Sequence, residues 1–270
     1  MAAMTLVNPA TIWPQQQPPL PISSFLEWYA IMDMVVVSGR RLLLTDWEHR
    51  SVLLVDSQVG GVLSRVNVPC VPCGVCMVHV ASAAVTQPYD KRFQYVHVNG
   101  DSLTLGNVVA VGGDVRGVNV LRNRLVVTYQ EPPAVEVVTQ EGKRLHRLDR
   151  GLFRHPEYVT VSGDRVFVSD WGTNAITMLS DQLQLLATFS QPDLLNQPKG
   201  IISLNDDQLL VCGWRSDNIV LLKPSSGRMS AILERKGGVK LPFALAFCHH
   251  SRTLYLTRDC TTSIQRYRLE

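Results

Sequence analysis

The sequence contains little charge and no long hydrophobic segment. Charged residues account for 18% of its 270 residues, the net charge is +3, and no run of 18 or more apolar residues occurs. Because a helix needs about 20 consecutive apolar residues to cross a bilayer, we expect no membrane span. So slight a positive charge permits an anionic partner without arguing for one, and we expect no binding to DNA.

The cysteines follow no regular spacing, and the first residues lack the features of a secretory leader. The six cysteines are irregularly spaced, and residues 1–15 have neither a basic start nor a long apolar centre. A chain of this size does not need disulfides to hold its core, and a leader requires both of the missing features. We therefore expect reduced thiols, a cytoplasmic location and a monomeric chain.

What is present is a short apolar run that recurs six times. Residues 42–47 (Leu-Leu-Leu-Thr-Asp-Trp) return closely in residues 166–171 and, with the aspartate lost, in residues 209–214. Weaker copies lie at residues 84–86, 125–128 and 254–257. The small polar residue that closes each run recurs at steps of 41, 42, 41, 43 and 45 residues: Thr45, Thr86, Thr128, Ser169, Cys212 and Thr257.

This repeat length is typical of a β-propeller, in which each repeat folds into one small sheet. No apolar pattern of helical period stands out, and 46% of the residues are hydrophobic, which is ample for a core. The sequence therefore predicts an all-β fold, a six-bladed β-propeller over residues 19–270 whose repeats begin near residue 32.

Each repeat is expected to supply four strands, from an inner first strand to an outer fourth strand. The inner strands are predicted at residues 35–37, 75–80, 118–121, 159–161, 201–204 and 244–247. They are apolar at nearly every position, as expected for sheets that are buried on both faces. The third strands are predicted at residues 52–55, 94–98, 135–138, 176–179, 219–222 and 264–267.

The sixth repeat ends after three strands, so its outer edge needs a partner. Exposed strand edges invite aggregation, and we expect an N-terminal segment to close the ring. Residues 1–18, with prolines on both sides of the glutamines at 15–17, have the composition of an extended tail or linker. The closing strand is therefore predicted at about residues 20–30, paired with residues 263–267.

Two repeats carry a longer pattern of an apolar triad, Thr or Ser followed by Asp, a polar turn and an aliphatic strand. Residues 45–52 and residues 169–176 follow it, and residues 72–75 and 198–201 share a Pro-x-Gly-aliphatic entry. These segments resemble NHL repeats, which form six-bladed propellers at the C-terminal end of many tripartite-motif (TRIM-NHL) proteins. The resemblance is strong in repeats one, four and five and weak in two and three. The Gly-His and Trp-Asp marks of seven-bladed WD40 propellers are absent.

The resemblance implies a module that binds proteins or structured RNA through one face of the disc. In that family the propeller often follows a RING, B-boxes and a coiled coil. Ahead of the propeller, this sequence contains no Cys and His residues at the spacing of a zinc-binding RING domain. Ubiquitin ligase activity is therefore not implied for it. We expect a non-catalytic protein-recognition scaffold, such as the substrate-recognition end of a tripartite-motif-like ligase. RNA stem-loop binding through a basic face is the alternative.

The recurring Asp and Trp residues follow the second strands. Asp46 and Asp170 are expected to accept hydrogen bonds from backbone N–H groups in the turns that follow, which would tie second strand to third. Trp47, Trp171 and Trp214 occupy one position of the repeat. They are expected either to pack between blades or to form an aromatic binding patch.

A cysteine-rich segment resembles a metal clip. Residues 70–79 have the spacing Cys-x2-Cys-x2-Cys-x2-His. A spacing of three along a strand sends side chains to opposite faces. We therefore expect the thiols of this segment to be buried or to bind nothing, and we expect no zinc.

The residues just before the inner strands should rim the central channel: Asp33, Cys73, Arg116, Glu157, Lys199 and Pro242. Two acids set against two bases make a poor site for a hard cation, which needs several converging oxygens. No Ser-His-Asp set accompanies a nucleophile motif either. We expect no metal, no cofactor and no enzyme activity, and a metal-dependent hydrolase or lactonase of the six-bladed type is the less favoured alternative.

The candidate binding face consists of the loops between second and third strands and the loops between blades. Its candidate residues are cations and tryptophans: Arg50, Lys91, Arg92, Arg116, Arg154, Lys199, Arg215, Lys240, Arg258, Trp47, Trp171 and Trp214. These cations can contact phosphates, but acids are interspersed among them. A continuous basic patch would favour RNA, whereas alternating signs with exposed Trp or Phe153 would favour protein. Residues 87–92 lengthen one turn, and such insertions tend to reach a ligand.

Overall fold

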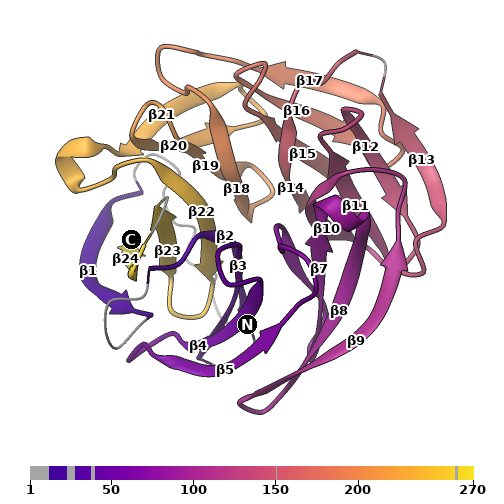
Figure 1. The fold of residues 1–270 in the computed structure, drawn as a ribbon. Helices are drawn as coiled ribbons and strands as arrows, with labels where there is room; N and C mark the ends of the chain where they lie inside the picture. The colour runs from indigo at the N-terminus through magenta and orange to yellow at the C-terminus, as the bar shows by residue number, and fades with distance from the viewer. Residues whose placement is uncertain (1–11, 23–27, 38–39, 150, 259–260) are drawn as a thin grey trace, which may run out of the picture.

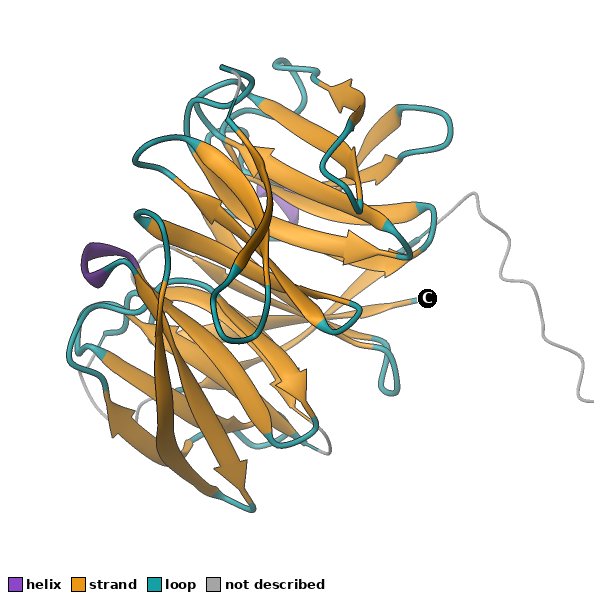
Figure 2. Cartoon of the chain, turned by 90° about the vertical axis from the view of Figure 1, so that its right-hand side faces the viewer, coloured by secondary structure: helices purple, strands orange, loops and turns teal. Residues whose placement is uncertain are grey.

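The computed structural model describes residues 12–22, 28–37, 40–149, 151–258 and 261–270, which form six antiparallel four-stranded sheets around a common axis (Figure 1). The fold is the six-bladed β-propeller that the repeat predicts. Strands and the loops that join them make up almost the whole described chain (Figure 2). Its two helical elements are single 3-10 turns, η1 (Pro88–Asp90) and η2 (Arg235–Gly237).

Blades 1 to 5 each use four consecutive strands, and the sixth combines the two ends of the described chain. Blade 1 contains β2 (Ile31–Val37), β3 (Arg41–Asp46), β4 (Ser51–Asp56) and β5 (Val62–Asn67). Blade 2 contains β6 (Val75–His79), β7 (Ser82–Gln87), β8 (Arg92–Asn99) and β9 (Ser102–Ala110). Blade 3 contains β10 (Val115–Leu121), β11 (Arg124–Tyr129), β12 (Ala134–Val138) and β13 (Arg144–Leu148). Blade 4 contains β14 (Pro156–Ser162), β15 (Arg165–Asp170), β16 (Ala175–Ser180) and β17 (Leu185–Phe189). Blade 5 contains β18 (Pro198–Asn205), β19 (Gln208–Gly213), β20 (Asn218–Lys223) and β21 (Arg228–Leu233). Blade 6 contains β22 (Pro242–Cys248), β23 (Thr253–Arg258), β24 (Ser263–Leu269) and β1 (Pro14–Pro21).

Both faces of each blade are buried, because every sheet packs against a neighbour on either side. In β3, Leu42 and Leu44 lie in the cluster shared with blade 6, whereas Leu43 lies in the cluster shared with blade 2. Successive residues of a strand point to opposite faces, so all three leucines are fully buried. This explains why the repeated runs are apolar at every position and not at alternate ones.

The sixth blade takes its outer strand from the N-terminal part of the chain. β1 pairs antiparallel with β24, with Pro14 opposite Leu269 and Gln17 opposite Arg266. Leu20 is fully buried in the hydrophobic cluster between blades 6 and 1. The predicted closure of the ring by an N-terminal strand is confirmed.

The closing strand lies earlier than expected, at Pro14–Pro21 and not at about residues 20–30. The Pro- and Gln-rich composition assigned to a tail therefore belongs largely to the strand itself. Proline cannot donate to a strand ladder, but an outer strand tolerates it because only one of its sides is paired. Residues 23–27 fall outside the described residues, and after them Tyr29 forms an isolated bridge with Thr261.

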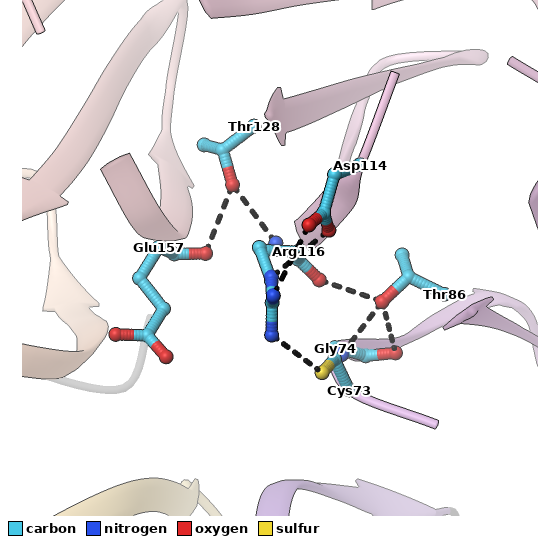
Figure 3. A network of polar contacts seen from close by, with 8 residues as sticks. Cys73, Gly74, Thr86, Asp114, Arg116, Thr128 and Glu157 are labelled. Atoms are coloured by element: carbon cyan, nitrogen blue, oxygen red, sulfur yellow. Dashed lines mark hydrogen bonds and ion pairs between the residues drawn. The ribbon is translucent and has the colours of Figure 1, made fainter. Parts of the chain in front are cut away.

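Hydroxyl groups at the repeated polar position join neighbouring inner strands (Figure 3). The Thr128 hydroxyl accepts a hydrogen bond from Gly117 N–H of its own blade at 2.8 Å and donates one to the Glu157 carbonyl of the next blade at 2.9 Å. The threonine is fully buried. It therefore satisfies two backbone groups that water cannot reach.

The same bridge recurs in the two preceding blades. The Thr86 hydroxyl accepts from Gly74 N–H at 2.7 Å and donates to the Arg116 carbonyl at 2.6 Å. The Thr45 hydroxyl donates to the Cys73 carbonyl of blade 2. The small polar residue that marks the repeat in the sequence is thus a connector between blades.

The inner strands approach so closely at these bridges that Gly117 and Gly74 leave no room for a side chain. A Cβ atom on Gly117 would lie 2.5 Å from the carbonyl oxygen of Glu157, and one on Gly74 would lie 2.4 Å from that of Arg116. Both distances are well inside van der Waals contact. The glycine of the Pro-x-Gly entry in repeat two is therefore required by the close packing of inner strands.

Removal of the closing strand should destabilise the propeller. A chain that begins at Met32 lacks β1, uncovers the edge of β24 and loses four buried side chains, those of Leu20, Ile22, Tyr29 and Ile31. Burial of four such side chains stabilises the fold by about 6–12 kcal/mol, so we expect the thermal midpoint to fall by roughly 20 °C or more. Calorimetry would compare it with a control chain that begins at residue 12. Equal midpoints would show that β1 contributes no stability.

Loss of one hydroxyl bridge between blades should lower the free energy of unfolding. Thr128→Val keeps the shape but leaves Gly117 N–H and the Glu157 carbonyl without their partner, which should lower the free energy of unfolding by about 2–3 kcal/mol. Thr104 is an exposed strand residue, and Thr104→Val should change it by less than about 0.5 kcal/mol. Urea unfolding of both variants tests this, and equal effects would rule out a structural role of the bridge.

Candidate binding face

The propeller has two faces that carry loops, and the inner strands begin at one of them. The loops that join second to third strands and those that connect successive blades emerge on what we call the upper face. The turns that join first to second and third to fourth strands emerge on the lower face. Figure 2 shows loops at both ends of the sheets. The contact residues predicted from the sequence all lie in the upper loops or next to them.

Two ion pairs lie at the mouth of the central channel on the upper face. Arg116 Nε lies 3.0 Å from Asp114 Oδ1, and these two residues flank the start of β10 (Figure 3). Lys199 Nζ forms an ion pair with Glu157 Oε2. All four side chains are at most 15% exposed. Because each cation is paired with an acid, the mouth carries little net charge.

The remaining polar groups at the rim do not assemble into a metal centre or an activated thiol. Within the described ranges, no three His, Cys, Asp or Glu side chains are placed to hold a metal ion. Cys70, Cys73 and Cys76 are free thiols. Burial raises the pKa of Cys73 to about 12, and the guanidinium of Arg116, 3.7 Å from its sulfur, opposes this rise only partly. The thiol is therefore protonated at neutral pH, which does not suit a nucleophile.

A hydrogen bond across the axis closes the channel just below its mouth. The Tyr158 hydroxyl, from β14 of blade 4, donates to the carbonyl of Met32 in β2 of the opposite blade 1. Burial raises the pKa of Tyr158 well above its ordinary value, so the hydroxyl keeps the proton that it donates. The space left among Cys73, Arg116 and Glu157 is about 10 Å³, room for about one water molecule. The centre of the upper face is therefore closed to larger ligands.

An aromatic pair covers one side of the closed mouth. Trp47 follows β3, and Tyr89 lies in η1, the longer turn of blade 2; their ring centroids are 5.7 Å apart in an edge-to-face arrangement. The guanidinium carbon of Arg116 lies 5.9 Å and 5.8 Å from the Trp47 and Tyr89 rings. Tyr89 is 63% exposed. The cluster thus presents an aromatic ring to solvent beside a cation.

A second cluster of rings surrounds Lys199. Trp171 and His155 are stacked with centroids 4.1 Å apart. The Lys199 ammonium lies 4.9 Å from the Trp171 ring and 5.5 Å from the Phe243 ring. The rings come from blades 4 and 6 and the lysine from blade 5. This arrangement joins three blades at the upper face.

Trp214 occupies the equivalent place in blade 5. The guanidinium carbon of Arg215 lies 4.6 Å from its ring. The Nε1 groups of Trp171 and Trp214 are buried, and neither donates to any residue that the structure describes. Buried N–H groups of this kind call for a partner such as a water molecule or a bound ligand.

The recurring aspartates form hydrogen bonds with groups in the loops of this face. As expected, Asp170 accepts hydrogen bonds from the following turn, from Gly172 N–H at 2.9 Å and Thr173 N–H at 3.1 Å. Asp46 instead contacts a side chain of its turn, with Oδ2 2.6 Å from Nδ1 of His49. Both carboxylates are fully buried. They hold the loops that carry Trp47 and Trp171 in place.

The predicted cations of the face differ in their exposure to solvent and in whether they form ion pairs. Arg116 and Lys199 are paired as described, and Arg92 pairs with Asp90 at 2.8 Å. Arg258 is half-buried at the end of β23. Five cations are exposed and form no ion pair with another described residue: Arg50, Lys91, Arg154, Arg215 and Lys240. Exposed acids such as Glu48, Glu131 and Asp193 are interspersed among them.

Two ring residues of the face do not follow from sequence reasoning: His155 and Phe243. Tyr89 belongs to the longer turn at residues 87–92, whose extra length already indicates a loop that reaches a ligand. His155 and Phe243 give no such signal, because their contacts join loops that are far apart in sequence. Phe153, which was considered for an exposed face, is buried.

Comparison with known proteins identifies the fold. No model of a protein family matches the sequence, and no curated protein matches it. Virginiamycin B lyase from Staphylococcus aureus, solved as an inactive variant with quinupristin, is similar in structure with a TM-score of 0.71 and 13% identity over 95% of this chain and 100% of that one. The Cps50 (Swd1) β-propeller domain of Myceliophteria thermophila has a TM-score of 0.67 and 12% identity over 89% and 83%.

A chain of a nidogen/laminin complex gives a TM-score of 0.67 and 15% identity, with 87% of this chain and 97% of that chain covered. These similarities establish the propeller fold and leave the function open. In the described part of the chain, no helix has the length and hydrophobicity that a membrane span requires.

One acid lies below the axial hydrogen bond, inside the channel. The carboxylate of Asp33 accepts hydrogen bonds from Met34 N–H and Val75 N–H, both at 2.9 Å. Burial raises the pKa of Asp33 to about 7, and the negative charge of Glu157 adds to this rise. The carboxyl group is therefore partly protonated at neutral pH.

Asp33 should make the stability of the propeller depend on pH. Its pKa rises from 3.8 to about 7 on folding, so its contribution is fullest below pH 4 and is lost as the pH rises to about 7. Asp33→Asn cannot ionise, so its stability relative to the wild type should increase by on the order of 2–4 kcal/mol between pH 4 and pH 8. Urea unfolding at both pH values measures this. The exposed Asp101→Asn is the control, and a pH-independent difference for Asp33→Asn would contradict the raised pKa.

Proposed function

We propose that this propeller is a binding module that recognises a protein partner through its upper face. The observation that carries the proposal is the pair of aromatic and cationic clusters beside the closed channel mouth, around Arg116 and Lys199. Trp, Tyr and Arg are the residue types that contribute most to binding energy at protein interfaces. Both clusters rest on inner strands and buried ion pairs, so few groups need to be ordered on binding.

The charge pattern of the face supports a protein partner. Exposed cations such as Arg50 and Arg154 alternate with exposed acids such as Glu48 and Glu131. A surface of mixed sign complements another protein surface better than it complements a uniformly charged polyanion. Tyr89, whose ring is largely exposed, lies among these charges and is the candidate anchor.

The resemblance of repeats one, four and five to NHL repeats supports the same proposal, because propellers of that family bind proteins or structured RNA. Its specific form is a substrate-recognition module in a tripartite-motif-like ligase. The nidogen/laminin complex is an example of a similar propeller fold in a protein assembly. An enzyme ranks lower, although virginiamycin B lyase shares the fold, because Asp114 and Glu157 at the mouth are each held in an ion pair.

Replacement of Tyr89 by alanine should weaken partner binding without unfolding the chain. Immobilised wild-type, Tyr89→Ala and Trp13→Ala propellers are incubated in parallel with cell extract, and the retained proteins are quantified by mass spectrometry. Trp13 is the matched control, because it is 67% exposed and precedes β1 at the lower end of blade 6. Loss of a hot-spot ring should reduce a true partner about 30-fold on Tyr89→Ala alone. Equal retention of every protein by all three chains would refute the proposed face.

Structured RNA is the alternative partner, and the exposed cations of the same face favour it. Each phosphate that a cation neutralises steepens the fall of affinity with salt. We would titrate the propeller with a pool of structured RNAs between about 50 and about 300 mM salt. Tight binding with a slope that becomes shallower by about one for each of Arg50→Ala and Arg154→Ala would establish RNA binding. Weak binding that disappears by physiological salt would leave the protein partner as the proposal.

A further inference from the structure

Below the Tyr158 to Met32 hydrogen bond, the central channel widens into a chamber on the side of the lower face. Its volume is about 300 Å³, which is at the lower end of the range for small-molecule sites. All six blades contribute residues of their inner strands to its wall. The axial hydrogen bond separates this chamber from the binding face described above. A ligand can therefore enter the chamber without competing for the upper face.

The wall of the chamber is of mixed polarity. Most of its residues are apolar, including Met77, Val161, Ile202 and Phe247, but polar groups contribute at least as much of its surface. Asn119, one of its few polar side chains, is occupied by backbone groups, since its Oδ1 accepts from Val120 N–H at 2.7 Å. Such a mixed wall suits a ligand that combines a short hydrocarbon body with a polar group.

The acid at the closed end of the chamber has acceptor capacity left. A carboxylate offers about four lone-pair positions, and Asp33 uses two of them for Met34 N–H and Val75 N–H. Asp33 forms no ion pair with any residue that the structure describes, since Arg116 and Lys199 pair with other acids. A desolvated carboxylate without an ion pair is destabilising unless a cation or a proton compensates its charge. The raised pKa of Asp33 expresses this cost.

We propose that the chamber is a binding site for a small organic cation, an aliphatic chain that ends in an ammonium group and donates hydrogen bonds to Asp33. The ammonium supplies the positive charge and the N–H donors that Asp33 lacks. The hydrocarbon chain lies along the apolar residues of the inner strands towards the lower face. An anionic ligand of the same length is repelled by the ionised carboxylate of Asp33.

The test uses the whole chain with n-hexylammonium as the probe at pH 8, where Asp33 is largely ionised. Methionine methyl groups labelled with carbon-13 report the binding by NMR. Met77 lines the chamber and is partly exposed, and Met34 follows Asp33 in the same wall with its side chain buried between blades 6 and 1. Met178 and Met229 lie in the core between blades 4 and 5, away from the chamber, and act as references. We expect saturable shifts of the first pair and none of the second. n-Hexanol should bind more weakly, and hexanoate should not bind.

Two variants separate the role of Asp33 from non-specific attraction. Asp33→Asn should weaken n-hexylammonium binding about tenfold or more, the effect of losing a charge-assisted hydrogen bond, and should leave n-hexanol binding unchanged. Asp101→Asn removes an exposed acid that is 73% exposed on the lower face and should bind like the wild type. The proposal is overturned if the shifts of Met34 and Met77 do not saturate, or if Asp33→Asn binds the ammonium as well as the wild type does.

Discussion

The hydroxyl of Thr128, placed between Gly117 of its own blade and Glu157 of the next, represents the constraint on which the ring depends. Inner strands converge on the axis, and their backbone groups meet where no water can enter. A short hydroxyl side chain satisfies a donor and an acceptor at once, and a glycine permits the approach. Blade 4 has Ser169 at this position, which donates to its own blade, so the connection is strongest among the first four blades.

The same convergence gives the molecule two separate regions. Because the inner strands lie so close together, one tyrosine reaches across the axis and closes it. Above the closure, ion pairs and rings form a rigid and nearly neutral centre surrounded by loops of mixed charge. Below it, an acid without an ion pair faces a chamber of mixed polarity. A large partner and a small ligand would thus meet different chemistry on opposite sides of one hydrogen bond.

The strands could be predicted from the sequence because burial on both faces leaves a local pattern. Leu42, Leu43 and Leu44 are apolar in succession since each touches one of two neighbouring blades. The closing strand was predicted too far along the chain, because amino-acid composition indicates only how a segment behaves on its own. Pro14 and its neighbours are extended in any case, and β24 supplies the ladder that makes them a strand. That partner lies at the other end of the chain, and local composition does not reveal it.

The sequence by itself determined the six blades, their order, the role of Asp170 and which loops share a face, because each depends on residues within one repeat. Only the tertiary structure decided which side chains meet between blades. Tyr158 and Met32 are 126 residues apart, and the rings around Lys199 belong to different blades. Their contacts follow from the closure of the ring, which sets distances that no spacing along the chain encodes. The chamber exists for the same reason, since its wall needs all six inner strands at once.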